Sequence, residues 1–245
     1  MGPADTWNRM GEWLSQLGAT LDQPPDAIIV VSAHWETTQV AVTSAERPSL
    51  IYDYYGFPKH TYELTYDAPG APALAHEICE MLACGGIAAT EDPDRGHDHG
   101  VFVPLKLMFP AATIPIVQVS LHQRLDPAFH LGVGEALAPL RERGVLIIGS
   151  GMSYHNMSRL MSGTTLIPES DQFNHWLNQT ILLDAAARTG RLTNWQNAPS
   201  ARQAHPREEH LLPLMVVAGA GGDDAAVTVF HDRVMGSAVS SVRFG

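Results

Sequence analysis

The sequence predicts an α/β protein with three layers, in which helices cover both faces of a mixed, largely parallel central sheet. Continuous apolar runs at 27–33, 114–121 and 144–151 have the composition of strands that are buried on both faces. Segments with helical spacing lie between these runs, and such an alternation of strand and helix is typical of a parallel or mixed sheet. The 245 residues are 45% hydrophobic and contain no internal repeat or linker, so we expect a single domain over 1–245.

Each expected element follows from a local signal. Apolar residues from Trp7 to Leu17 keep helical spacing, and Asp5 or Thr6 is a suitable cap for this first helix. The other expected elements are a strand at 38–43, an ordered loop at 52–70, a helix near 71–84 that ends at Gly85, a helix from Asp126 to Gly144, a long helix over 168–188, a helix from about Pro206 through 220, and strands at 226–230 and 237–244.

Composition excludes several classes of protein. The net charge of −11 leaves no basic surface for phosphate groups, so we expect no nucleic-acid partner. Cys79 and Cys84 form neither a disulfide framework nor a cysteine zinc site. The first residues lack the pattern of a signal peptide, and no apolar run reaches the length of a membrane span. We therefore expect a soluble, cytoplasmic protein with no membrane partner.

Histidine is the unusual residue, with 12 copies against 15 Lys plus Arg. His34 follows the strand at 27–33, and His155 follows the strand at 144–151 by way of GSGMSY. Ligands of open α/β sheets bind beyond the carboxyl ends of the strands, where both histidines are expected. His210 is expected in the first turns of the late helix, and His99 lies in the loop GHDHG. This grouping indicates a metal site or an acid–base site.

Simpler interpretations remain for each histidine. His34 and His155 are also compatible with histidines that only satisfy backbone groups, and His97 is expected in a solvated turn. His205 is compatible with a place in the pocket or in a surface loop. The remaining histidines are assigned to the surface or to structure: His60, His76, His122, His130, His175 and His231. The chain lacks the HExxH, GxSxG and GK[ST] motifs, so zincin, serine hydrolase and phosphate-loop chemistry are not indicated.

Five segments together resemble one family. They are SAHW at 32–35, YDYYGFP at 52–58, HDHGVFVPL at 97–105, the GSG…HN stretch at 149–156 and PREEHLLPLMVVAGA at 206–220. In this order they are similar to the extradiol aromatic ring-cleavage dioxygenases of the LigB type, in particular the DOPA-4,5-dioxygenase-like branch. The closing MGSAVSSVRFG also fits this family.

The resemblance implies a mononuclear non-haem metal, iron(II) for activity, although zinc can occupy the site in isolated protein. It implies that His34 and His210 are metal ligands, that His155 is the acid–base residue, and that the catalytic His99 lines the substrate pocket. The implied substrates are a small aromatic diol, such as a catechol, and O₂. The following residues are further candidates for the substrate pocket: His205, Tyr55 and Glu209. The tyrosines and Phe57 of YDYYGFP are suited either to an aromatic pocket wall or to packing of the loop.

One departure from the family concerns its first strand, which usually ends in an HG-x-P segment whose histidine is another metal ligand. No histidine precedes His34 in this chain. Either the start lies at an internal methionine, the strand was lost, or another residue substitutes, for which the candidates are Glu208, Glu209 and His205. Without that ligand we expect weaker metal binding and an empty position in the sheet. Two alternatives therefore stay open: a zinc-dependent hydrolase on a related scaffold, and a non-catalytic binding homologue.

Overall fold

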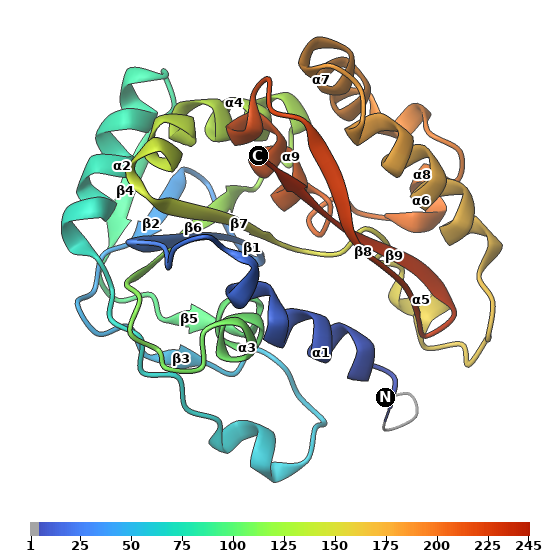
Figure 1. The fold of residues 1–245 in the computed structure, drawn as a ribbon, viewed down its shortest axis with the longest axis horizontal. Coiled ribbons are helices and arrows are strands. Elements are labelled where there is room, and N and C mark those ends of the chain that lie inside the picture. Colours follow the sequence, from blue (N-terminus) through green and yellow to red (C-terminus); the bar gives the residue numbers. More distant parts are fainter. Residues whose placement is uncertain (1–4) are drawn as a thin grey trace.

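A five-stranded sheet forms the middle layer of the computed structural model, which describes residues 5–245 (Figure 1). Met1–Pro3, which the resemblance places after the family's first strand, lie outside the described residues. The strand order is β4-β2-β6-β1-β7, and only the pair β2–β6 is antiparallel. The strands are β1 (Ala27–Thr37), β2 (Val40–Thr43), β4 (Ala89–Asp92), β6 (Ile116–His122) and β7 (Val145–Ser150). The predicted fold class is therefore confirmed.

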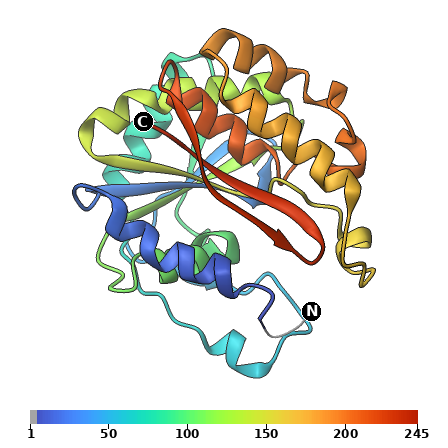
Figure 2. The same cartoon turned by 45° about the vertical axis from the view of Figure 1, so that its right-hand side comes forward.

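Side chains of β1 alternate between two hydrophobic clusters, one on each face of the sheet. Ile29 and Val31 pack into the larger cluster, beneath α2 (Pro72–Cys84), α4 (Pro127–Leu137) and α9 (Leu212–Gly221). Ile28 and Val30 pack into the smaller cluster, against α3 (His99–Met108) and α1 (Asn8–Leu17). Figure 2 shows the two helical layers on opposite sides of the sheet. Burial on both faces explains why residues 27–31 of β1 are apolar without interruption.

The remaining elements extend this core. An antiparallel hairpin of β8 (Ala226–Val234) and β9 (Ser237–Phe244) forms a separate two-stranded sheet, and β3 (Leu50–Ile51) pairs with β5 (His97–Asp98). The other helices are α5 (Met157–Leu160), α6 (Pro168–Ile181), α7 (Ala185–Thr193) and α8 (Ala201–Ala204), with 3₁₀ turns at Gly18–Thr20, Lys59–Glu63, Ala138–Arg143 and Trp195–Asn197. Within residues 5–245, no helix is long and apolar enough to cross a membrane.

Three predicted helix boundaries are wrong. The helix expected over 168–188 is two helices, because the Asp184 carboxylate accepts a hydrogen bond from the Ala187 amide and caps a new one. The late helix begins at Leu212 rather than near Pro206, with Pro213 in its first turn. At the N-terminal helix, Trp7 occupies the cap position and neither Asp5 nor Thr6 does. The caps predicted at Asp126 and Gly144 are confirmed.

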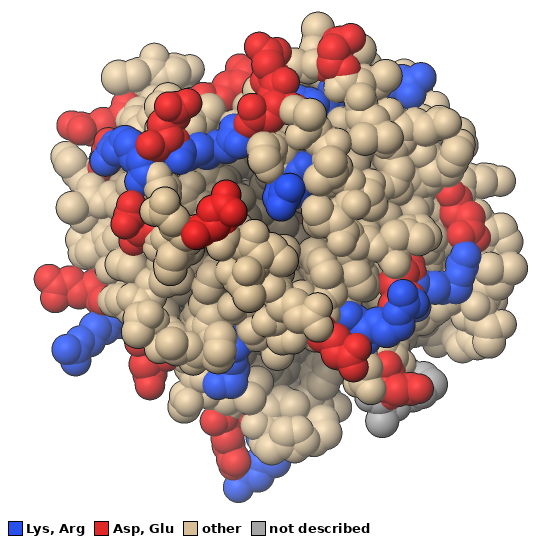
Figure 3. All heavy atoms as spheres, in the orientation of Figure 1, with Lys and Arg blue, Asp and Glu red and all other residues tan. Residues whose placement is uncertain are grey.

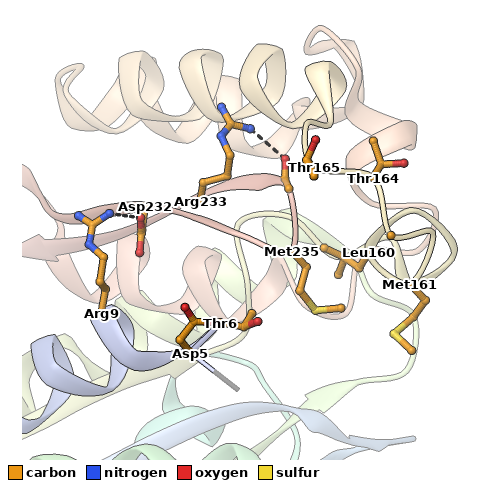
Figure 4. A pocket seen from close by; sticks show the side chains of 12 residues that line it. Asp5, Thr6, Arg9, Leu160, Met161, Thr164, Thr165, Asp232, Arg233 and Met235 are labelled. Atoms are coloured by element: carbon orange, nitrogen blue, oxygen red, sulfur yellow. Dashed lines mark hydrogen bonds and ion pairs between the residues drawn. The ribbon is translucent and has the colours of Figure 1, made fainter. Parts of the chain in front are cut away.

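Two cavities flank the hairpin. A cavity of about 580 Å³ separates the edge strand β7 from β9 and is lined by apolar residues of α1 and α9, with His210 on its wall. Figure 3 shows a hollow near the middle of this face of the molecule. The second cavity, of about 620 Å³, lies between the start of α1, the segment after α5 and the β8–β9 turn (Figure 4). There Arg9 forms an ion pair with Asp232, and Met161 and Met235 supply apolar walls.

Candidate metal and catalytic site

Four histidines from distant parts of the chain lie side by side. The rings form a row in which His99 and His34 have centroids 4.0 Å apart, His34 and His210 lie 5.0 Å apart, and His210 stacks on His155 at 3.3 Å. His34 lies in β1, where the pairing with β6 shifts register between Val31 and Glu36. His99 begins α3, His155 follows β7, and His210 precedes α9. The structure thus brings together the four histidines that the sequence singled out.

Asp98 joins the two segments that carry His34 and His99. Its fully buried carboxylate caps α3 by accepting a hydrogen bond from the Gly100 amide, and it also accepts one from the Ser32 hydroxyl at 2.8 Å. The Ser32 hydroxyl in turn accepts the amide of His34 at 3.2 Å. An ion pair with Arg95 at 3.3 Å balances the buried charge. Asp98 therefore fixes the position of the β1 backbone relative to the start of α3.

Close backbone contacts hold the other two histidines together. A Cβ atom at Gly151 would lie 2.2 Å from the His210 carbonyl oxygen, so only glycine fits there. The Met152 amide donates to that same carbonyl oxygen at 2.9 Å, and the His155 amide donates to the Ala204 carbonyl at 3.0 Å. The glycine-rich segment after β7 thus packs directly against the segment that carries His210.

Two carboxylates flank the row of histidines. Asp53 Oδ1 lies 2.7 Å from His99 Nδ1, and Asp53 Oδ2 lies 3.6 Å from His34 Nδ1. Glu209 Oε1 lies 2.9 Å from His210 Nδ1 and 3.5 Å from His155 Nδ1. Burial raises the pKa of each carboxyl group, but hydrogen bonds from the histidines outweigh it. The pKa of Asp53 is lowered to about 2, and the pKa of Glu209 also lies below its usual range.

The proposed ligand histidines carry no charge at neutral pH. Burial, together with the neighbouring His99 and His210, lowers the pKa of His34 to about 4. Burial likewise lowers the pKa of His210. Neutral imidazoles with carboxylates beside them form a donor set that suits iron(II) or zinc. The residues present therefore fit a divalent metal.

The other predicted site residues have different surroundings. Glu209 belongs to the cluster, whereas the Glu208 carboxylate pairs with Arg202 at 2.7 Å. His205 is fully buried behind the cluster, where its Nε2 lies 3.1 Å from the Ser153 carbonyl oxygen and its ring contacts Phe173 and Trp195. Tyr55 is 88% exposed and faces solvent.

The prediction of a solvated turn at His97 is wrong. His97 is only 1% exposed, because β5 pairs with β3 and carries its side chain into the interior. Asp53 was not predicted at all. It lies in YDYYGFP between Tyr52 and Tyr54, whose hydroxyl groups donate to the Leu64 and Thr61 carbonyls and anchor this loop. An acidic residue in a loop gives no sequence signal of its position beside two histidines.

The buried histidines predict a pH dependence of stability. Burial lowers the pKa of His205 from 6.5 to about 3 and that of His97 to about 4. Between these values and about pH 6.5, the unfolded chain binds protons that the folded chain does not. The free energy of unfolding should therefore decrease as the pH falls through this range, by up to about 1.4 kcal/mol per pH unit for each histidine.

The variant His205→Gln tests this linkage by urea unfolding at a series of pH values. Because glutamine does not titrate, the variant should lose stability less steeply than the wild type as the pH falls. The exposed His175→Gln should keep the wild-type slope. An unchanged slope in His205→Gln would show that His205 is not held neutral by burial.

Comparison with known proteins identifies a family for this chain. The family model described as the catalytic LigB subunit of aromatic ring-opening dioxygenase matches residues 4–244. The 4,5-DOPA dioxygenase extradiol of Beta vulgaris is 39% identical over 218 residues, which cover 88% of this chain and 81% of that protein. The protein of the same name from Escherichia coli K12 is 36% identical over 235 residues, covering 94% and 86%.

A solved structure shows the same fold. The crystal structure of an uncharacterized protein from Escherichia coli K12 matches with a TM-score of 0.82 and 33% identity, over 96% of this chain and 92% of that chain. The family match spans nearly the whole chain, and the relatives share over a third of their residues with it. The chain therefore belongs to the LigB family of aromatic ring-opening dioxygenases and is an extradiol ring-opening enzyme.

Proposed function

We propose that this enzyme cleaves a catechol-type ring with O₂ at a single non-haem iron(II) held by His34 and His210. The observation that carries the proposal is the row of four histidine rings, in which the two proposed ligands are adjacent at 5.0 Å. The names of the relatives, 4,5-DOPA dioxygenase extradiol, support a catechol as the substrate class. Zinc, which accepts the same donor atoms, is expected to occupy the site in some preparations.

Held by His34 and His210, a divalent metal would supply a Lewis-acidic centre that lowers the pKa of a bound catechol and favours its reaction with O₂. The protein supplies the groups around it. His155 lies beside His210, with the two rings stacked at 3.3 Å, so it is placed to accept a phenolic proton and later to return one. His99 lies at the other end of the row, against His34, and is placed to hold the substrate. The proposed proton-transfer residue His155 and the proposed substrate-binding residue His99 thus lie at opposite ends of the row of histidines.

The packing of the site supports this division. His99 contacts the ring of Tyr54, with centroids 5.6 Å apart, and this gives the His99 end an aromatic neighbour. Glu209 and Arg207 lie at the other end, where Arg207 also binds Glu36 at 2.5 Å. The His99 end is therefore the better match for an aromatic ring, and the His155 end for charge and protons.

The test is anaerobic reconstitution with iron(II), followed by addition of air-saturated buffer with DOPA or plain catechol. Oxygen uptake and the visible absorbance of a ring-opened product should both appear with iron and be absent with zinc. Absence of both signals in a protein that binds iron would contradict the proposal and favour the zinc-dependent hydrolase. Failure to bind metal would favour a binding homologue without catalysis.

A further inference from the structure

We infer that Asp53 and Glu209 are positioning residues, which hold the four histidines of the site so that every Nε2 atom is available to metal or substrate. The inference deepens the proposed function, on which it rests, and gives Asp53 and Glu209 a role other than substrate binding or metal ligation. Two groups of three side chains, one with Asp53 and one with Glu209, each have ligand atoms within 4.8 Å of one another. Taken separately, each group has the composition of a metal site.

The ring atoms involved argue against two metal sites. All four contacts between a carboxylate and a histidine are made at Nδ1: His34 and His99 with Asp53, and His155 and His210 with Glu209. Asp53 accepts the Nδ1 proton of His99 at 2.7 Å and Glu209 accepts that of His210 at 2.9 Å, which leaves the lone pair of each ring on Nε2. The Nδ1 atoms of His34 and His155 face the same two carboxylates at 3.6 Å and 3.5 Å. Among the described residues, none of the four Nε2 atoms has a hydrogen-bond partner within the protein. Each carboxylate therefore contacts two rings at Nδ1, and the Nε2 atom of each ring stays free.

The surroundings of each carboxylate agree with this role. Asp53 Oδ1 also accepts the backbone amide of His99 at 3.0 Å, so the carboxylate is tied to the start of α3. Glu209 Oε2 lies 3.5 Å from the Arg207 guanidinium.

The two groups are joined through their ligand histidines. His34 of the Asp53 group and His210 of the Glu209 group are the inner pair of the row, and His99 and His155 are the outer pair. Each carboxylate thus binds one proposed ligand and one proposed catalytic histidine. The two groups are best explained as halves of one site, in which Asp53 sets the orientation of one pair of rings and Glu209 sets the other.

The experiment reads the histidine tautomers directly in metal-free protein. Long-range ¹H–¹⁵N correlation spectra of protein labelled in the histidine rings separate the Nδ1–H and Nε2–H forms at mildly alkaline pH, where imidazole is ordinarily neutral. The wild type should show the Nδ1–H form at all four positions. In Asp53→Ala, His34 and His99 should shift to the Nε2–H form that free imidazole prefers, while His155 and His210 stay unchanged. Glu209→Ala should give the converse pattern.

Metal binding supplies the second readout, measured by titration with zinc alone. Loss of either carboxylate should weaken zinc binding by about 10–100-fold while the stoichiometry stays at one metal per chain. Asp53→Asn and Glu209→Gln should recover most of the affinity, because an amide oxygen still accepts the Nδ1 proton. Asp67→Asn, at an exposed carboxylate in a nearby loop, is the matched control and should behave as wild type.

Several outcomes would overturn the inference. Unchanged tautomers in both alanine variants would show that the carboxylates do not set them. Two metals per chain, or loss of zinc in the amide variants as complete as in the alanine variants, would show that Asp53 or Glu209 is itself a ligand. Because the spectra need neither metal nor substrate, a protein that fails to cleave catechol still tests the inference separately from the proposed function.

Discussion

His155→Ala should keep its metal and lose ring-cleavage turnover by about 10²–10⁴-fold, the range expected when a general acid–base group is removed. The His155 ring stacks on His210 without being one of the proposed ligands, and the His155 amide donates to the Ala204 carbonyl, a contact that alanine retains. The metal content, measured by elemental analysis, should therefore equal that of the wild type. The loss should appear in kcat for oxygen uptake rather than in the KM for the catechol.

The variant His34→Ala should behave differently, because His34 is a proposed ligand. It should lose most of its metal and show no turnover at any substrate concentration. His175→Ala, at an exposed histidine of α6, controls for the loss of an imidazole and should match the wild type in both properties. Equal metal loss in His34→Ala and His155→Ala would contradict the assignment of separate roles.

Asp98→Ala should destabilise the protein by about 3 kcal/mol, the lower end of the range for breaking a buried ion pair. The Asp98 carboxylate is fully buried and binds Arg95, Ser32, Gln118 and the Gly100 amide, so its removal leaves several polar groups without a partner. Urea unfolding measures the change in free energy. Since Asp98 also ties β1 to α3, metal affinity should decrease in the same variant.

The matched control for Asp98→Ala is Asp94→Ala, which removes a carboxylate from the same segment. Asp94 is exposed, so this substitution should change the free energy of unfolding by less than about 0.5 kcal/mol. Equal effects of the two substitutions would show that the buried hydrogen bonds of Asp98 do not hold the segment. A large effect of Asp98→Ala on stability with unchanged metal affinity would show that the link to His34 has no influence on the site.

The fold was readable from the sequence because strands buried on both faces need continuous apolar runs. The runs at 27–33, 114–121 and 144–151 correspond to β1, β6 and β7, and they lie next to one another in the sheet. The position of His155 beyond β7 followed from the same reasoning, since the carboxyl ends of adjacent parallel strands meet at one edge. His34 was expected just after its strand, but it lies inside β1, which continues to Thr37. For β1, β6 and β7 the continuous apolar run was a sufficient signal, because the burial that produces such a run also determines the position in the sheet.

Other features depend on contacts that no local pattern records. Asp53 reaches His99 only because Tyr52 and Tyr54 anchor its loop through hydroxyl contacts to Leu64 and Thr61. The burial of His97 depends on a strand pair of two residues each, which is too short for periodicity to reveal. The role of the family's HG-x-P histidine, and the weaker metal binding expected without it, stay predictions.

The most direct test of the proposed chemistry is cleavage of catechol by the iron-loaded enzyme under ¹⁸O₂, with the product reduced at once to trap any aldehyde and analysed by mass spectrometry. An extradiol dioxygenase inserts both atoms of O₂ into the opened ring, so the product should carry two labelled oxygen atoms. A product without label, formed equally well in the absence of oxygen, would contradict the dioxygenase reaction.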